Sequence, residues 1–215
     1  MSSKESPACC VALLWGRLYA CFKGMAFEPY PPQCSLHLPT TFGPMKPIVI
    51  TGPESSGKTT LARHLITEFD LPYIPEYSRV YLESISRDYT PADIINIAIG
   101  QVALVESISA AFPDRPYLIL DTWMLEIRIW VQYRFGEIPD VIEKLYREHL
   151  PVLYVLCTPD IAWAHDPLRE NPHDREELFG LYQSAIEESL VPYIVISGER
   201  RETQAVQGIH DFLRR

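Results

Sequence analysis

The residues with the most specific chemistry form one short run, Gly52-Pro53-Glu54-Ser55-Ser56-Gly57-Lys58-Thr59-Thr60. This run matches the phosphate-binding pattern G-x-x-x-x-G-K-[ST], the P-loop. Its glycines let backbone amides surround a phosphate, and its lysine reaches the β- and γ-phosphates of a nucleotide. The hydroxyl of Thr59 is placed to ligate Mg²⁺. The run therefore predicts a site that binds ATP and Mg²⁺.

Two carboxylates follow apolar, strand-like runs, and ligands bind at the carboxyl ends of parallel strands. Asp121 is expected to hold Mg²⁺ beside the P-loop, directly or through water. The alternative for it is to cap the following helix. Glu76 is expected to orient an acceptor hydroxyl and take its proton, and Arg79 to steady the phosphoryl group. A helix-capping acid with a surface salt bridge is the alternative for this pair.

Charge, proline and arginine crowd residues 159–175, a composition typical of a mobile lid. Arg169 and Arg175 are expected to close over ATP and to neutralise charge on the transferred phosphoryl group. A solvated loop whose arginines pair with nearby carboxylates is the alternative. In a later turn, Gly198 and Arg200 are expected to contact the adenine base, unless this turn merely connects to the last helix.

Aromatic residues offer a platform for a flat, cationic ring, through stacking and cation–π attraction. Three of them are candidates for binding substrate: Tyr77, Trp123 and Trp130. Tyr77 and Trp123 are preferred because they come just after predicted strands. Core packing is the commoner role for a tryptophan on a helix, such as Trp130.

The elements that must position these residues alternate between short apolar runs and longer helical patterns. Strands are predicted over residues 48–52, 73–76, 117–121, 152–157 and 193–197. Helices are predicted over residues 57–69, 77–86, 92–112, 123–133, 140–149, 175–190 and 203–213. This order predicts an α/β fold, a P-loop NTPase with three α/β/α layers and a five-stranded parallel sheet.

The first 44 residues differ from the rest of the 215-residue chain. They contain five prolines in their second half and no sustained helical or strand period. They resemble a secretory signal peptide poorly. We expect residues 1–44 to be a poorly ordered extension and the folded domain, residues 45–215, to begin at Met45.

Composition argues against several classes of partner. The chain has 28 acidic and 19 basic residues and a formal charge of −9, so nucleic acid is not an expected partner. Its uninterrupted apolar stretches fall short of the roughly 20 residues that span a bilayer, which predicts no membrane segment. The five cysteines form no disulfide framework, and a cytoplasmic location is expected.

Five segments together resemble the ribosylnicotinamide kinase domain of NadR-type proteins: GPESSGKTT, PEYSR, LILDT, PDIAWAHDPLRENPHDREELF and SGERRE. The resemblance runs from about Met45 to the C-terminus. Its P-loop is generic, whereas PEYSR and the D-x-L-R-E-N-P-x-x-R phrase are more specific. The resemblance implies a P-loop kinase that transfers the γ-phosphate of ATP to the 5′-hydroxyl of nicotinamide riboside. The product would be nicotinamide mononucleotide, for NAD biosynthesis.

The resemblance also implies roles for single residues. Lys58 and Thr59 take the phosphate and magnesium roles, and Asp121 takes the second magnesium role. Arg169 and Arg175 are implied as lid residues. The acceptor-side residues are implied to be Glu76 and Arg79.

One departure affects the acceptor site, because related sequences commonly read D-T-D where this chain has Asp121-Thr122-Trp123. The sequence leaves open which nucleoside is the acceptor and which carboxylate is the acceptor-side base. It also leaves open whether the protein is a homo-oligomer. The alternatives are a kinase for another nucleoside or for a nucleoside monophosphate, and a regulatory ATPase with slow turnover.

Overall fold

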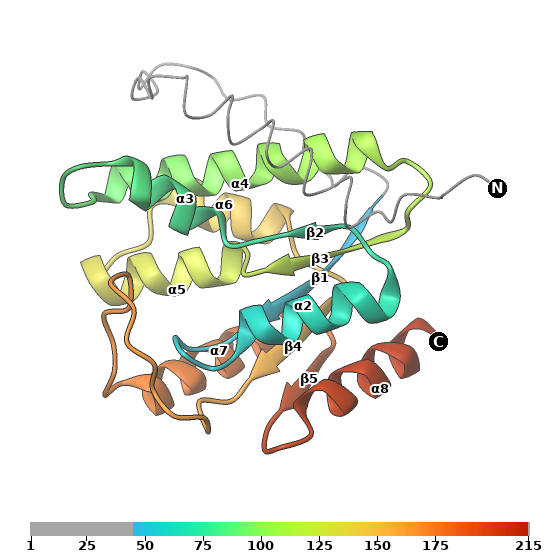
Figure 1. Ribbon diagram of the computed structural model, residues 1–215. Coiled ribbons are helices and arrows are strands. Elements are labelled where there is room, and N and C mark those ends of the chain that lie inside the picture. The colour runs from blue at the N-terminus through green and yellow to red at the C-terminus, as the bar shows by residue number, and fades with distance from the viewer. Residues whose placement is uncertain (1–44, 215) are drawn as a thin grey trace.

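All five predicted strands form one parallel sheet (Figure 1). The computed structural model describes residues 45–214, and the predictions for residues 1–44 lie outside the described residues. The strands are β1 (Lys46–Thr51), β2 (Tyr73–Ile74), β3 (Tyr117–Asp121), β4 (Leu153–Cys157) and β5 (Tyr193–Ile196). They lie in the order β2-β3-β1-β4-β5, and every pairing is parallel.

The predicted helices are also present, with ends that differ by one or two residues. They are α2 (Lys58–Phe69), α3 (Tyr77–Ser84), α4 (Pro91–Ala111), α5 (Met124–Phe135), α6 (Asp140–Glu148), α7 (Arg175–Ser189) and α8 (Arg201–Leu213). Each connects successive parallel strands or follows the last one, as the crossover rule for parallel sheets requires.

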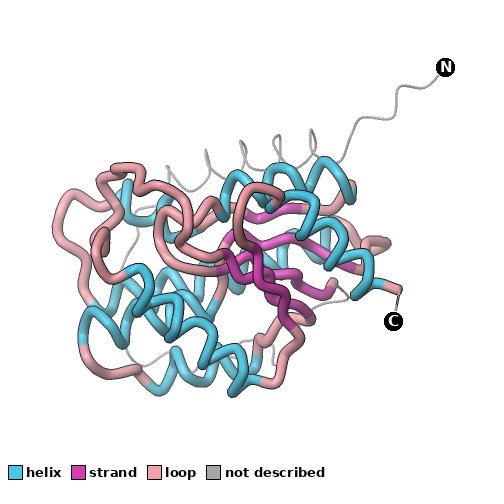
Figure 2. The backbone as a smooth tube through the Cα atoms, turned by 90° about the horizontal axis from the view of Figure 1, so that it is seen from below, coloured by secondary structure: helices cyan, strands magenta, loops and turns pink. Residues whose placement is uncertain are grey.

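Two helical layers cover the two faces of the sheet (Figures 1 and 2). Successive side chains of a strand point to opposite faces, and β1 shows this clearly. Ile48 and Ile50 pack in the cluster that contains Leu61 of α2 and Ile209 of α8. Val49 packs in the other cluster, which the helices α3 to α7 complete. The three-layer α/β/α prediction is confirmed.

The register of the sheet places the predicted site residues at the carboxyl ends of adjacent strands. Asp121, the last residue of β3, pairs with Ile50 near the end of β1, and Thr51 pairs with Leu156 of β4. The P-loop follows Thr51 directly. The predicted magnesium carboxylate therefore lies beside the predicted phosphate loop.

Helix α4 departs from the prediction that no segment is long and apolar enough for a membrane. It has 21 residues and a mean hydropathy of 1.6 in its most apolar window, half of which is buried in the structure. The prediction missed it because isolated polar residues interrupt the apolar run. Buried core helices of globular proteins share these properties, so length and composition alone assign α4 to neither setting.

Candidate active site

The P-loop depends on a glycine at its first position. Gly52 has φ +132°, a conformation that L side chains rarely adopt, and a Cβ there would lie 2.4 Å from the carbonyl oxygen of Cys157 in β4. The second glycine, Gly57, has φ +81° and precedes the first residue of α2. The loop is thus a sharp turn pressed against β4, and it leads directly into a helix N-terminus, which favours anions.

The side chain of Lys58 is held in place by backbone carbonyls of the P-loop. Its Nζ donates hydrogen bonds to the carbonyl oxygens of Gly52 at 2.7 Å and Pro53 at 2.9 Å. The same nitrogen lies 3.4 Å from Oε1 of Glu126 in α5. Burial acts to lower the pKa of this ammonium, but nearby carboxylates outweigh it and raise the pKa. Lys58 is therefore a fixed cation at the phosphate site.

Asp121 and Thr59 form an oxygen-rich corner that fits Mg²⁺. Oδ1 of Asp121 is buried and has no hydrogen-bond partner among residues 45–214, while Oδ2 accepts a hydrogen bond of 3.3 Å from Tyr73. Burial raises the pKa of Asp121, and its hydrogen bond with Thr59 opposes this rise. Mg²⁺ takes few protein oxygens and keeps its waters or phosphate ligands. The described residues contain no cluster of three His, Cys, Asp or Glu residues able to hold a metal.

Glu126 is a site residue that the sequence analysis missed. It lines the cavity beside Lys58, and its Oε2 is buried with no hydrogen-bond partner in the described part of the chain. Burial raises its pKa to about 8, and the charges of Glu76 and Asp121 add to that rise against the pull of Lys58. A signal was present in the sequence, because Glu126 interrupts the apolar run of α5 between Leu125 and Ile127.

A cavity of about 420 Å³ lies next to Lys58. Its walls come from the P-loop, α3, α5, α7 and the connection between β4 and α7. Glu76 and Arg79, the two predicted acceptor-side residues, line it. Trp130 of α5 lines it too, and its Nε1 donates a hydrogen bond of 3.2 Å to the hydroxyl of Tyr89, another lining residue. The cavity therefore combines carboxylates with an aromatic wall.

Two of the three predicted aromatic residues lie elsewhere. Trp123 is 1% exposed, and its Nε1 donates a hydrogen bond of 2.7 Å to the carbonyl of His149. Tyr77 is 4% exposed and packs so closely on Gly100 that a Cβ there would lie 2.5 Å from its hydroxyl. Both belong to the hydrophobic core, so their positions do not support the prediction that they contact substrate. Trp130, the least favoured candidate, is the one that lines the cavity.

The segment of residues 158–174, called the lid here, is tied to the P-loop. The Glu54 carboxylate accepts hydrogen bonds from the backbone amides of Glu170 at 3.0 Å and Asn171 at 2.9 Å. Ser55 Oγ accepts another, of 2.9 Å, from the amide of Ala164. The lid is thus fixed along one side of the nucleotide loop.

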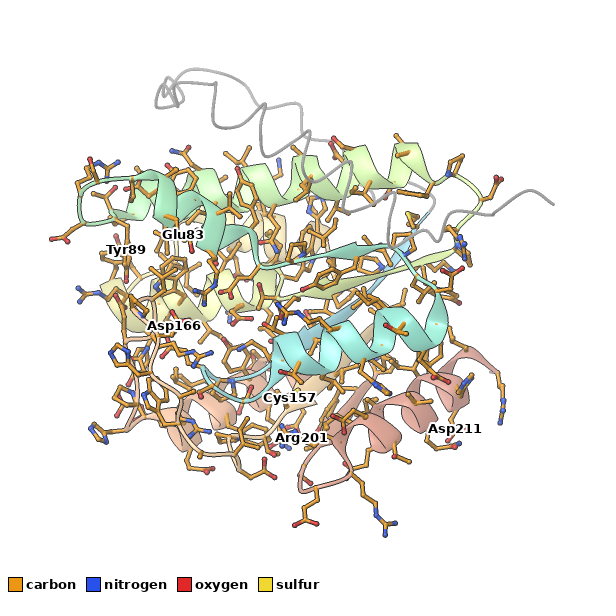
Figure 3. The ribbon with its side chains drawn as sticks, in the orientation of Figure 1. Glu83, Tyr89, Cys157, Asp166, Arg201 and Asp211 are labelled. Carbon is orange, nitrogen blue, oxygen red and sulfur yellow. The ribbon has the colours of Figure 1, made fainter. Side chains whose placement is uncertain are left out.

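The lid is also tied to the opposite side of the cavity. Asp166 forms an ion pair of 3.1 Å with Arg79 of α3. The hydroxyl of Tyr89 donates a hydrogen bond of 2.8 Å to Glu170. Tyr89 and Asp166 lie at the same end of the molecule (Figure 3). The lid is therefore closed over the cavity.

The two predicted lid arginines have different surroundings. Arg169 lines the cavity, donates a hydrogen bond to the carbonyl of Ala164 and lies 6.0 Å from the ring of Trp163. Arg175 does not line it. Its guanidinium donates to the carbonyls of Ile161 at 2.9 Å, Ser55 at 3.3 Å and Pro159. Arg169 can reach a ligand, whereas Arg175 holds the lid to the P-loop.

Arg201, the first residue of α8, is another site residue that the sequence analysis missed. Arg201 pairs with Asp160 of the lid and donates a hydrogen bond of 2.9 Å to the carbonyl of Ser56. The predicted neighbours Gly198 and Arg200 are exposed and do not line the cavity. Their predicted contact with adenine stays a prediction.

The different surroundings of the two lid arginines lead to a prediction. Arg175→Ala leaves partly buried carbonyls without their donor, so we expect a loss of about 2 kcal/mol of unfolding free energy and of about 4–8 °C in Tm. Arg169→Ala should change Tm by less than about 2 °C but lower the maximal rate of phosphoryl transfer more than it weakens nucleoside binding. Thermal unfolding and steady-state kinetics of both variants check this. Equal losses of Tm would contradict it.

Comparisons with known proteins identify a family and a relative. The family model AAA_28, described as an AAA domain, matches residues 47–203. The trifunctional NAD biosynthesis/regulator protein NadR of Escherichia coli (strain K12) is 24% identical over 193 residues, which are 85% of this chain and 46% of that protein. The chain thus spans about half the length of this curated relative.

Solved structures of NadR protein have the same fold. The complex with NR has a TM-score of 0.65 at 22% identity and covers 79% of this chain and 52% of that one. The complex with NAD and AMP-PNP has a TM-score of 0.61 at 21% identity and covers 79% of this chain and 49% of that one. The resemblance to NadR-type proteins and the P-loop α/β fold are confirmed.

Proposed function

The chain belongs to the AAA domain family AAA_28, and on that premise we propose that it is an ATP- and Mg²⁺-dependent nucleoside kinase. The preferred acceptor is nicotinamide riboside, phosphorylated on its 5′-hydroxyl to nicotinamide mononucleotide in NAD biosynthesis. One observation carries the proposal. A fixed P-loop lysine lies at the edge of a cavity whose walls combine carboxylates and an aromatic ring.

The P-loop supplies the phosphate side of the reaction. The backbone amides between Gly52 and Gly57 surround the β- and γ-phosphates, and Lys58 neutralises charge on them. Thr59 and Asp121 would hold Mg²⁺ through their oxygens. When bound, this ion neutralises charge that develops on the phosphates during transfer. From the lid, Arg169 would add a second positive charge on the cavity side.

The cavity supplies the acceptor side. Its volume of about 420 Å³ lies within the range of small-molecule sites. The nicotinamide ring of nicotinamide riboside carries a positive charge. The carboxylate of Glu76 attracts such a cation, and the ring of Trp130 offers it a stacking surface. Arg79 is paired with Asp166, so its proposed role is to hold the lid over the acceptor.

The proposed kinase domain spans residues 45–215, beginning at Met45. Its expected partners are the nucleotide and a small nucleoside, and its expected location is the cytoplasm. Met45 is fully buried in the core cluster of the α3 to α7 face, which supports this boundary.

A phosphoryl-transfer assay with purified protein tests the proposal. ATP and Mg²⁺ are supplied with nicotinamide riboside, uridine, cytidine, thymidine or adenosine, and the phosphorylated nucleoside and ADP are both measured. We expect nicotinamide riboside to have the highest kcat/KM. Preference for another nucleoside would keep the kinase and change its acceptor. ADP formation that no acceptor accelerates would favour the regulatory ATPase instead.

A further inference from the structure

We infer that Glu126 is the catalytic base that takes the proton of the acceptor hydroxyl, an inference that rests on the proposed kinase function. The sequence analysis gave this role to Glu76. Both carboxylates line the cavity, so the choice between them depends on the groups around each one.

Glu126 lies where a base for this transfer must lie. The acceptor oxygen has to come within roughly 3–3.5 Å of the phosphorus that it attacks. Lys58 neutralises the same phosphoryl group, and Oε1 of Glu126 is 3.4 Å from its Nζ. A carboxylate so near the phosphate-binding cation, in the wall of the acceptor cavity, is within hydrogen-bond reach of the attacking hydroxyl.

Glu126 also has an oxygen available for that hydroxyl. Its Oε2 is buried and has no hydrogen-bond partner of normal distance and angle among residues 45–214, although buried polar atoms are usually paired. The Tyr182 hydroxyl is the neighbouring group that interacts with this carboxylate. Glu76 also has one engaged oxygen, because its Oε1 accepts a hydrogen bond of 3.0 Å from Ser78. Glu76 directly precedes the first residue of α3 and lines the cavity too. The proximity of Glu126 to Lys58 therefore favours Glu126 as the base and leaves Glu76 to bind the acceptor.

The charges around Glu126 suit a base that works near neutral pH. Four groups face it: Lys58 from α2, Glu76 before α3, Asp121 from β3 and Tyr182 from α7. Burial and the two carboxylates outweigh the single ammonium and raise the pKa of Glu126 to about 8. A general base is most effective when its pKa is close to the working pH.

The transfer step moves one proton to Glu126 and one phosphoryl group to the acceptor. The O–H bond of the acceptor breaks, and its proton moves to Oε2 of Glu126. The acceptor oxygen forms a bond to the γ-phosphorus of ATP. The bond from this phosphorus to the bridging oxygen breaks, and ADP leaves with that electron pair. The proton passes to solvent after the product has left.

At the departure from D-T-D, position 123 carries no carboxylate. Trp123 stands at the position of the second aspartate, and its side chain is buried in the core. Glu126 follows three residues later, about one helical turn along α5. It is the carboxylate that α5 contributes to the cavity lining.

The test compares wild type with Glu126→Gln and with the control Glu83→Gln, an exposed residue of α3 that does not line the cavity. Glu126→Gln keeps an oxygen near Lys58 but removes the base. We expect kcat to fall by about 10²–10⁴-fold, with the Kd of an ATP analogue and the Tm almost unchanged. The control should match wild type. A kcat of Glu126→Gln within fivefold of wild type would overturn the inference.

The pH profile separates a base from a merely structural residue. Because Glu126 must lose its proton to act, wild-type kcat/KM should rise with pH, reach half its maximum near pH 8 and level off above about pH 9. Glu126→Gln should lose this rise, whereas Glu76→Gln should keep it and raise the KM of the acceptor. Retention of the rise in Glu126→Gln would overturn the inference.

A second variant covers the case in which Glu126→Gln folds poorly. Glu126→Asp keeps a carboxylate and should retain the pH-dependent rise at a lower kcat. A flat profile in folded Glu126→Asp would also overturn the inference. Failure of the proposed function looks different, because wild type would then phosphorylate no nucleoside.

Discussion

Replacing Lys58 with methionine is expected to lower the rate of phosphoryl transfer by at least about 10³-fold. The ammonium is fixed 2.7 and 2.9 Å from two P-loop carbonyls, so it meets the phosphates with little reorganisation. Methionine keeps the length and apolar character of the side chain but removes the charge. Single-turnover rates with saturating ATP and nucleoside measure the effect. Lys144→Met, at an exposed lysine of α6, is the matched control and should retain full activity.

The stability of Lys58→Met has to be measured at controlled pH. Glu126 already binds its proton more tightly in the folded chain than its ordinary pKa of 4.5 would allow. The contribution of such a group to the free energy of unfolding therefore decreases as the pH rises from its ordinary pKa of 4.5 through its folded-state pKa of about 8. Removing Lys58 enlarges this loss, so unfolding should be compared at pH 6, where Glu126 is protonated. A folded variant with a rate within tenfold of wild type would contradict the P-loop assignment.

Gly52→Ala is expected to destabilise the fold by about 3 kcal/mol or more and to abolish nucleotide binding. The added Cβ would lie 2.4 Å from the carbonyl oxygen of Cys157, and φ is +132°. The contact is with backbone of a central strand, so the loop must move rather than a side chain. The corresponding loss of Tm is about 6–12 °C. Thermal unfolding and titration with an ATP analogue measure both effects.

Gly180→Ala provides the control for this substitution. Gly180 lies within α7, and a Cβ there would meet no atom within 4 Å. Alanine favours a helix over glycine by up to about 1 kcal/mol, so this variant should be as stable as wild type or more stable. Equal stability of the two alanine variants would show that the close approach of Gly52 to β4 does not constrain the loop.

The sheet and the phosphate loop could be predicted because both depend on local patterns. Alternating apolar runs and helical periods mark every strand and helix in the described residues, and the motif marks the loop between β1 and α2. Asp121 was predictable because it ends an apolar strand. All these features are fixed by residues close together in the chain.

The cavity walls could not be predicted in the same way, because they depend on how helices pack. Trp123 and Trp130 lie on the same segment, and only the packing of α5 decides that the first is buried and the second lines the cavity. Glu126 was missed for the same reason. Arg201 was missed because α8 begins two residues earlier than its pattern predicts, which makes Arg201 its first residue.

The ties between the lid and its surroundings have a consequence for the speed of turnover. Glu54, Arg79 and Tyr89 hold the lid from three parts of the chain. A product enclosed beneath it leaves only after these contacts break together, a collective motion on the microsecond-to-second scale. We expect release to limit kcat, which should fall as solvent viscosity rises. Glu54→Gln, which weakens one tie by removing its charge, should shorten the residence time of the product.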